Sequence, residues 1–258
     1  MSITEITKLY NKFIDEIVEE TMLYQDGEIN KDHYENFLYK LPEMWKSGEK
    51  SCRSAFVISV IENIFKMEIP RKIKLSLISL DIKINSLDEL LDNENLSYGN
   101  KASFVISNLY SDISLYNMAN EIFVENYKKY ISAILAVPVM EKRTYNKIVK
   151  CSHEEEKKYI KKSYSYRAQD ISIFIKLPSE LLELKLIGCL EKEFYRYRKS
   201  RLAIGDLKDF EEDLENNEYK PTTALFKKGY TYDEIEDKIN SIKEDFEKKV
   251  CVGFQQML

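Results

Sequence analysis

Turn-forming residues are scarce in this chain, which has only seven Gly and five Pro among its 258 residues. An all-β chain of this length would need many more of them to reverse direction between strands. Apolar residues (44%) and charged residues (32%) are in the balance of a folded globular protein. No repeat, low-complexity tract or linker interrupts them. We therefore expect an all-α protein with a single domain over residues 1–258.

Hydrophobic periodicity indicates where the helices lie. Apolar residues recur every three to four positions over most of the chain, which is the period of an amphipathic helix. The pattern predicts helices at about 3–24, 31–41, 52–67, 71–92, 101–117, 119–148, 154–177, 180–214 and 231–252. Pro138, Pro178 and Pro221 should mark kinks or ends of helices, because proline lacks a backbone N–H.

The segment 71–92 is ambiguous from sequence alone. Its apolar residues partly alternate with polar ones, which taken alone indicates a strand; they are Ile73, Leu75, Leu77, Leu80, Ile82 and Ile84. A lone strand in a helical chain would leave its backbone groups without partners. A helix that is buried on most sides gives the same pattern, so we predict a helix here.

Charge and composition exclude several function classes. The net charge of −5 gives no electrostatic reason to expect a nucleic-acid partner. The four cysteines and two histidines have no metal-ligand spacing, so we expect reduced thiols and no zinc site. The N-terminus has no signal-peptide pattern, and no run of about eighteen apolar residues could span a membrane. We expect a cytoplasmic protein.

Two acidic clusters are the residues most suggestive of chemistry. Asp88 and Asp92 are four positions apart on the predicted helix 71–92, with Glu89 beside them. A second cluster contains Asp206, Asp209 and Asp213 in a similar helical register. Such pairs also arise on ordinary solvated helix faces. If the two clusters face each other across a bundle, however, they form a site for Mg²⁺, which prefers carboxylates, water and phosphate oxygens.

The surroundings of the clusters carry a family resemblance. Asp88–Ala102 resembles the aspartate-rich segment (DDxxDxxxxRRGxP) of trans-polyprenyl diphosphate synthases, and Gly48–Ser54 resembles their GGKRLRP segment. Ala168–Asp170 and Leu177–Pro178 follow where that family has a Lys-Thr pair and then Leu-Pro, ahead of the acidic cluster at 205–213. Each match is degenerate, but their order is that of the class I isoprenoid synthase superfamily over most of the chain.

The resemblance implies a bundle of about ten or more helices around a central cavity, with three Mg²⁺ ions clamping the diphosphate of an allylic prenyl substrate. It implies these metal ligands: Asp88, Glu89, Asp92, Asp206, Asp209 and Asp213. Asp88, Asp92 and Arg167 would be catalytic. The other substrate-binding candidates are Lys50, Arg53, Tyr98, Phe104 and Lys208. For the oligomeric state of the protein, we consider a homodimer.

Departures from the family pattern narrow the expected reaction. Ser97 and Tyr98 replace the two arginines that help elongating synthases hold two diphosphates. The second acidic cluster has Gly205, Asp209 and Asp213 at i, i+4 and i+8, the spacing of the metal triad of terpene cyclases. The family's histidine ahead of the first motif is near Asp81 here, and its Lys-Thr pair is near Gln169-Asp170.

We therefore expect a Mg²⁺-dependent terpene synthase that ionises an allylic prenyl diphosphate, releases diphosphate, and cyclises or deprotonates the carbocation. One alternative is a trans-prenyl diphosphate synthase that condenses an allylic diphosphate with isopentenyl diphosphate. A second alternative is a catalytically silent regulatory subunit of such a synthase.

Overall fold

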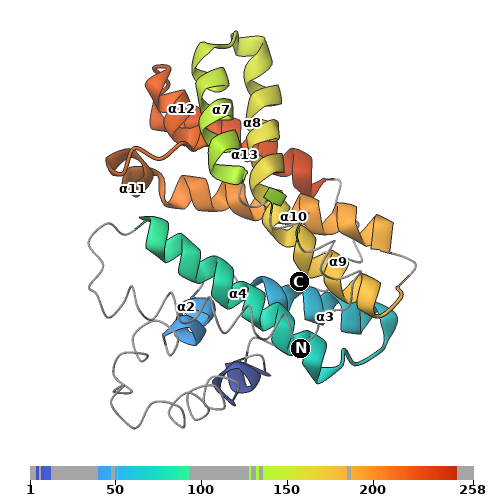
Figure 1. Cartoon of the computed structure of the whole chain (residues 1–258). Coiled ribbons are helices and arrows are strands. Elements are labelled where there is room, and N and C mark those ends of the chain that lie inside the picture. The colour runs from blue at the N-terminus through green and yellow to red at the C-terminus, as the bar shows by residue number, and fades with distance from the viewer. Residues whose placement is uncertain are drawn as a thin grey trace, which may run out of the picture. The chain divides into compact units, whose positions relative to one another are not determined.

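A computed structural model describes residues 4–5, 7–12, 40–47, 50, 52–92, 128, 132–133, 136–184 and 187–248, and for 87–92 and 187–189 the backbone alone. The chain divides into two compact units, Met1–Phe123 and Val124–Leu258, which we describe separately. In the described ranges every regular element is a helix, and none is a strand (Figure 1). The all-α prediction is confirmed for these residues, and a single domain stays a prediction.

The first unit contains α2 (Leu41–Ser47), α3 (Arg53–Phe65) and α4 (Arg71–Asp92). The ambiguous segment 71–92 is a helix with the predicted bounds. Its core side is apolar, with Leu77, Ile78 and Leu80 fully buried, and α4 packs against α3. Ser76 and Ser79 are also buried, and each hydroxyl donates to the carbonyl four residues earlier. Small, internally satisfied serines therefore let a helix bury most of its circumference despite a strand-like pattern.

The N-terminus of α3 is capped by a side chain from α4. Cys52, the N-cap residue, forms no side-chain cap. The carboxylate of Asp81 instead accepts hydrogen bonds from the backbone N–H groups of Arg53 (3.2 Å) and Ser54 (2.6 Å), and its Oδ1 lies 3.6 Å from the Arg53 guanidinium. Burial raises the pKa of Asp81 to about 6, against the opposing effects of Arg53 and these hydrogen bonds. Helices α3 and α4 are thus joined by a buried polar contact.

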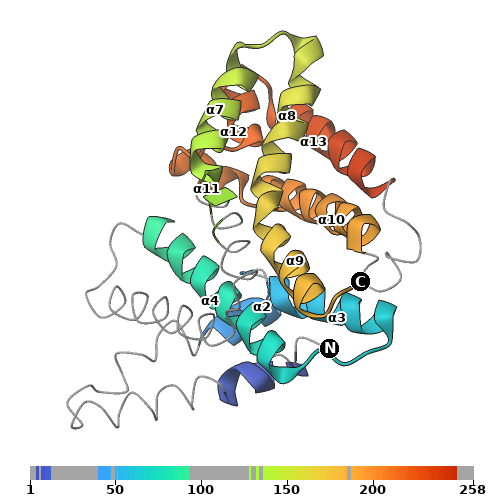
Figure 2. The same cartoon turned by 45° about the vertical axis from the view of Figure 1, so that its right-hand side comes forward.

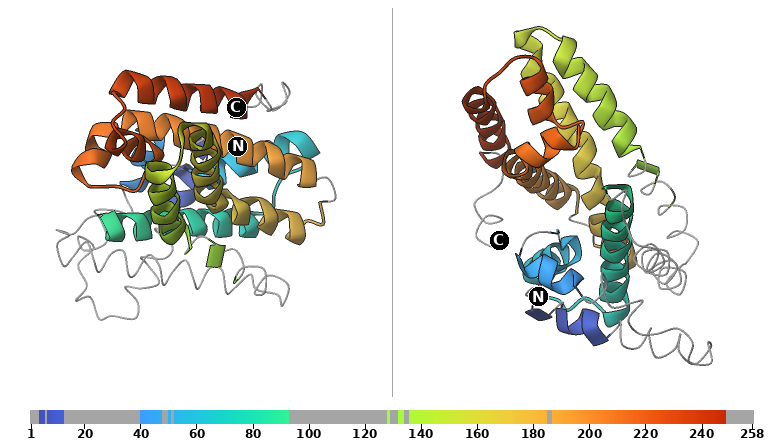
Figure 3. Two further views of the ribbon diagram at one scale, coloured as in Figure 1. Left: turned by 90° about the horizontal axis from the view of Figure 1, so that it is seen from above. Right: turned by 90° about the vertical axis from the view of Figure 1, so that its left-hand side faces the viewer.

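The second unit holds the remaining described helices. They are α7 (Val137–Lys150), α8 (His153–Arg167), the 3₁₀ turn η2 (Ala168–Ile171), α9 (Ser172–Leu181), α10 (Ile187–Lys208), α11 (Phe210–Glu215), α12 (Pro221–Lys227) and α13 (Tyr232–Glu247). Helices α7 and α8 form an antiparallel hairpin that stands steeply on α10 (Figure 2). Helix α13 lies along α10 (Figure 3).

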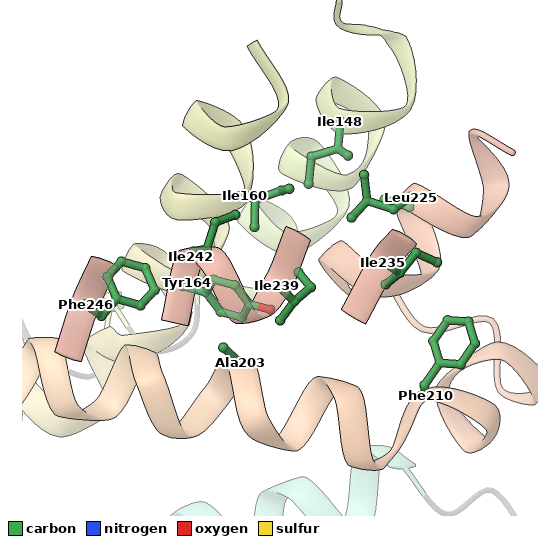
Figure 4. Close-up of a cluster of buried hydrophobic side chains, with 11 residues drawn as sticks. Ile148, Ile160, Tyr164, Ala203, Phe210, Leu225, Ile235, Ile239, Ile242 and Phe246 are labelled. Atoms are coloured by element: carbon green, nitrogen blue, oxygen red, sulfur yellow. The ribbon is translucent and has the colours of Figure 1, made fainter. Parts of the chain in front are cut away.

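The core of this unit forms where these helices meet. Ile160 and Tyr164 from α8 point towards Ile239 and Ile242 from α13, above Ala203 of α10 (Figure 4). All five side chains are buried. The small Ala203 lets α10 approach closely beneath the larger side chains. Burial of this kind contributes about 25 cal/mol for each Å² of apolar surface removed from water.

Several predicted bounds differ from the structure at helix junctions. The predicted helix 154–177 is divided by η2 into α8 and α9, and the predicted helix 180–214 is divided into the end of α9, α10 and α11. Helix α7 ends near the predicted bound, with Pro138 in its first turn, as Pro221 is in α12. Helices α2 and α12, which are only seven residues each, were not predicted from the hydrophobic periodicity. Short helices show too few turns for periodicity to be visible.

Among the helices described, none has the length and apolar character needed to cross a lipid bilayer.

A buried carboxylate ties three helices of the second unit together. Glu156 of α8 accepts hydrogen bonds from Lys228 just after α12, from Lys238 of α13 (3.0 Å) and from Tyr230 (2.9 Å). The exposed His153 lies 3.0 Å from the same carboxylate. Burial by itself raises the pKa of Glu156, but the hydrogen bonds from the lysines and the tyrosine outweigh it and lower the pKa to about 2.

This lowered pKa has a consequence for stability. Because the pKa of Glu156 falls from an ordinary 4.5 to about 2 on folding, ionised Glu156 stabilises the protein above pH 4.5. The contribution is about 3 kcal/mol and disappears as the pH falls from 4.5 towards 2. We expect Glu156→Gln to lower the free energy of unfolding by about that amount at pH 7, measured by urea denaturation, and by much less at pH 3.

Glu154→Gln is the matched control, because Glu154 is exposed on the same helix. Its free energy of unfolding should stay within about 0.5 kcal/mol of the parent protein. An equal loss for Glu156→Gln at both pH values would contradict the ionic role of Glu156.

Candidate functional site

The first acidic cluster occupies the C-terminal end of α4. Asp88 and Asp92 are one helical turn apart on its backbone, with Glu89 between them, as the sequence predicted. Of the candidate substrate-binding residues near this motif, Tyr98 and Phe104 lie outside the described residues. Lys50 is half-buried ahead of α3, and Arg53 is buried against Asp81.

The second acidic cluster begins on α10 and continues into α11. Asp206 and Asp213 are both buried, whereas Asp209, at the N-cap of α11, is exposed. Backbone hydrogen bonds from Asp209 to Gly205 and from Asp213 to Asp209, both 2.8 Å, carry the helical turn through the α10–α11 junction. The predicted i, i+4 pair of Asp209 and Asp213 is therefore in helical register, but its two side chains differ in exposure.

Arg167, at the C-terminus of α8, is the cation that pairs with Asp206 of this cluster. Its guanidinium donates to both carboxylate oxygens of Asp206, at 2.7 and 2.6 Å, and its Nε lies 3.0 Å from Glu141 of α7. The guanidinium carbon is also 5.8 Å from the ring centre of Tyr164. Burial disfavours the charged guanidinium, but Asp206 and Glu141 more than compensate and hold the Arg167 pKa above its ordinary value. Arg167 thus links α7, α8 and α10.

The carboxylate of Asp213 is the unusual member of the cluster. The residue is only 8% exposed, yet its carboxylate accepts no hydrogen bond from any described residue and forms no ion pair with one. Burial raises its pKa to about 7; Lys220 and Arg167 oppose the rise, and Asp206 and Glu218 add to it. Burial likewise raises the pKa of Glu141 despite Arg167. The cluster therefore holds more negative charge than its own cations neutralise, and additional positive charge would stabilise it.

The second cluster does not form a complete metal site by itself. Within the described ranges no group of three or more Asp, Glu, His or Cys side chains is arranged to hold a metal ion. The Asp206 carboxylate already accepts hydrogen bonds from Arg167, and Gly205 has no side chain that could bind a metal ion. Asp209 and Asp213 are the carboxylates that remain open to a cation. Lys208, another substrate-binding candidate, is exposed beside them.

Sequence reasoning missed two residues of this cluster. Glu141 lies on α7 and Tyr164 lies on α8, and neither helix carries one of the two predicted acidic clusters. A signal for Glu141 was present, because it shares the helical face of Thr144 and Ile148, which is the buried face of α7. An acidic residue on an apolar helix face needs a cationic partner, and that partner is Arg167.

No protein-family model, curated protein or solved structure matches this chain.

The raised pKa of Asp213 predicts a stabilising substitution. In the unfolded chain this carboxyl ionises near its ordinary 3.8, but in the folded protein only near 7, so folding takes up a proton between these values. Stability is therefore greatest below pH 3.8 from this group and falls as the pH rises towards 7. We expect Asp213→Asn to raise the free energy of unfolding at pH 8 by roughly 1–3 kcal/mol.

The measurement is urea denaturation at pH 8 and at pH 5, where the difference between variant and parent should be smaller. Asp209→Asn is the control, since Asp209 is exposed and should change stability little at either pH. A destabilised Asp213→Asn variant at pH 8 would show that the ionised carboxylate has a partner in the folded protein.

Proposed function

We propose that this protein is a Mg²⁺-dependent terpene synthase of the class I type, which ionises one allylic prenyl diphosphate. The observation that carries the proposal is Asp213, which is only 8% exposed and whose carboxylate has no hydrogen-bond partner among the residues that the structure describes, in a cluster rich in negative charge. Buried carboxylates are normally paired or bound to a metal. Asp213 also lies in the motif that resembles the family's second metal-binding segment.

The residues at hand fit a divalent cation in part. Asp209 is exposed and the Asp213 carboxylate has no partner in the described part of the chain, so both can donate oxygen atoms, as Mg²⁺ requires. Asp88, Glu89 and Asp92 supply the other acidic segment in the proposal. Bound Mg²⁺ would stabilise the negative charge that develops on the departing diphosphate.

Arg167 has a defined place in this proposal. Its guanidinium is held by Asp206 and Glu141 beside Asp213, so it is oriented before any substrate arrives. A planar guanidinium is well suited to phosphate oxygens. We propose that Arg167 positions the diphosphate, and that the Asp206 pair keeps the guanidinium ordered when no substrate is bound.

The contacts also favour one diphosphate substrate rather than two. Arg53, one of the substrate-binding candidates, forms part of the buried α3–α4 junction with Asp81. Where the family has its Lys-Thr pair, Gln169 accepts a hydrogen bond from Tyr195 (3.2 Å), and Asp170 accepts hydrogen bonds from Arg198 (2.6 Å). Residues at these positions thus serve internal packing, which supports the terpene synthase over the condensing prenyl diphosphate synthase.

A second candidate is the catalytically silent subunit. The Arg167–Asp206 pair favours it, because that contact removes one carboxylate from the acidic motif. This candidate predicts no binding of diphosphate.

The catalytic test is diphosphate release from geranyl, farnesyl and geranylgeranyl diphosphates with Mg²⁺, with products identified by mass. We expect release with the allylic substrate alone and a loss of about 100-fold or more in Asp88→Ala, because charge stabilisation of the leaving group is lost. Asp237→Ala is the matched control, since Asp237 is exposed on α13 and belongs to neither cluster. Equal turnover in Asp88→Ala and the parent would refute the assignment, and turnover only after isopentenyl diphosphate is added would favour the condensing synthase.

Thermal unfolding with Mg²⁺ and inorganic diphosphate separates the synthase from the silent subunit. A ligand at 100 times its Kd stabilises the folded state by about 2.7 kcal/mol, so the synthase should show a higher Tm with both components than with either alone. Arg167→Met should reduce this increase. An unchanged Tm in the parent protein would favour the silent subunit.

A further inference from the structure

The outer face of α7 is strongly basic in a chain whose net charge is −5. Four cations lie on it within nine residues: Lys142, Arg143, Lys147 and Lys150. All four are exposed, and none forms an ion pair with a described residue. The one acidic residue of α7, Glu141, is committed to Arg167. This stretch of surface therefore carries uncompensated positive charge, and we call it the α7 face.

The positions on α7 form one stripe. Spacings of three, four and seven to eight residues place Val139, Lys142, Arg143, Lys147 and Lys150 on the same side of the helix. The opposite side is anchored by the buried Ile148 and by Thr144. At a rise of about 1.5 Å per residue, the cations from 142 to 150 extend over about 12 Å in a line. Lys147 and Lys150 also suit the negative end of the helix dipole, but Lys142 and Arg143 do not lie in the last turn.

Apolar and aromatic groups accompany the cations. Val139, at the start of α7, is 69% exposed, the largest exposure among the big apolar side chains described. Tyr219 is 39% exposed, and the Lys142 ammonium lies 5.3 Å from its ring centre. Lys227 of α12 lies 5.9 Å from the ring centre of Tyr145 in the same way. The α7 face thus combines exposed cations with an exposed aliphatic residue and a partly exposed tyrosine.

We propose that the α7 face docks on the surface of an anionic lipid bilayer. Lipid phosphates would neutralise the cations, while Val139 and Tyr219 would enter the headgroup boundary, where aliphatic and tyrosine side chains are favoured. Nucleic acid fits less well, because the Lys142 ammonium lies over one face of the Tyr219 ring, which is therefore not open for a base to stack on. An acidic peptide would match the charge but leave Val139 in water.

Vesicle co-sedimentation of the full chain, without substrate, tests this surface. The parent protein should bind vesicles of phosphatidylcholine mixed with phosphatidylglycerol, bind phosphatidylcholine alone much more weakly, and dissociate at high salt. The triple substitution Lys142→Gln, Arg143→Gln and Lys147→Gln should weaken the partition coefficient by about 100-fold, at about fivefold for each cation.

The matched control is Lys72→Gln, Lys192→Gln and Arg201→Gln, three exposed cations away from α7. It removes the same charge, so it should bind vesicles within about twofold of the parent if the α7 face is responsible. Val139→Ser should weaken vesicle binding without changing its salt dependence, because no charge is altered.

Three outcomes would overturn the proposal: no binding of the parent to anionic vesicles, equal losses in the two triple variants, or binding of single-stranded RNA or polyglutamate in place of vesicles. Circular dichroism of each variant excludes loss of folding as the cause. Because no substrate is present, failure of the lipid surface and failure of the synthase assignment are distinguishable.

Discussion

The position of Arg167 between Asp206 and Glu141 is the contact on which the second unit depends. It joins the end of α8 to α7 and α10, and it is largely shielded from water. Removing one partner of a buried ion pair destabilises the folded protein, because the other charge is left buried and unpaired. The apolar core formed by α8, α10 and α13 lies next to it through Tyr164. The arrangement of the acidic cluster at the α10–α11 junction follows from this contact, since Asp206 faces Arg167 while Asp209 remains in solvent.

Two buried carboxylates of the same unit show opposite physical behaviour. Glu156 is surrounded by cationic and hydroxyl donors, so its ionised form stabilises the fold. Asp213 is buried almost as deeply, but its carboxylate has no hydrogen-bond partner among the described residues, so burial makes its ionised form costly to stability. A carboxylate that destabilises the apo protein is easiest to understand if a cation supplies what the surrounding residues do not, which is why Asp213 supports the proposed function more strongly than Asp206 does.

Basic residues fall into two groups: some pair with buried carboxylates, and others face solvent. Arg53, Arg167 and Arg198 are committed to carboxylates inside their own units, at Asp81, Asp206 and Asp170. The cations of α7, in contrast, face solvent. Guanidinium groups that pair with carboxylates hold the helices in place, while the exposed cations are available to an external anionic partner.

The sequence by itself determined the helical class, the helix over 71–92 and the helical spacing of Asp88 and Asp92, whereas the predicted helix 180–214 breaks at Asp209, inside the second acidic segment. The helical class follows from hydrophobic periodicity and the scarcity of Gly and Pro, which are visible in a single chain. The helix over 71–92 follows from that class, because a lone strand among helices would leave its backbone groups without partners. Only the tertiary structure decided which charged residues are paired. Arg167 meets Asp206 across 39 residues, and Glu156 meets Lys238 across 82. Such pairs depend on how the helices pack, so the exposed Asp209 and the buried Asp213 look alike in the sequence.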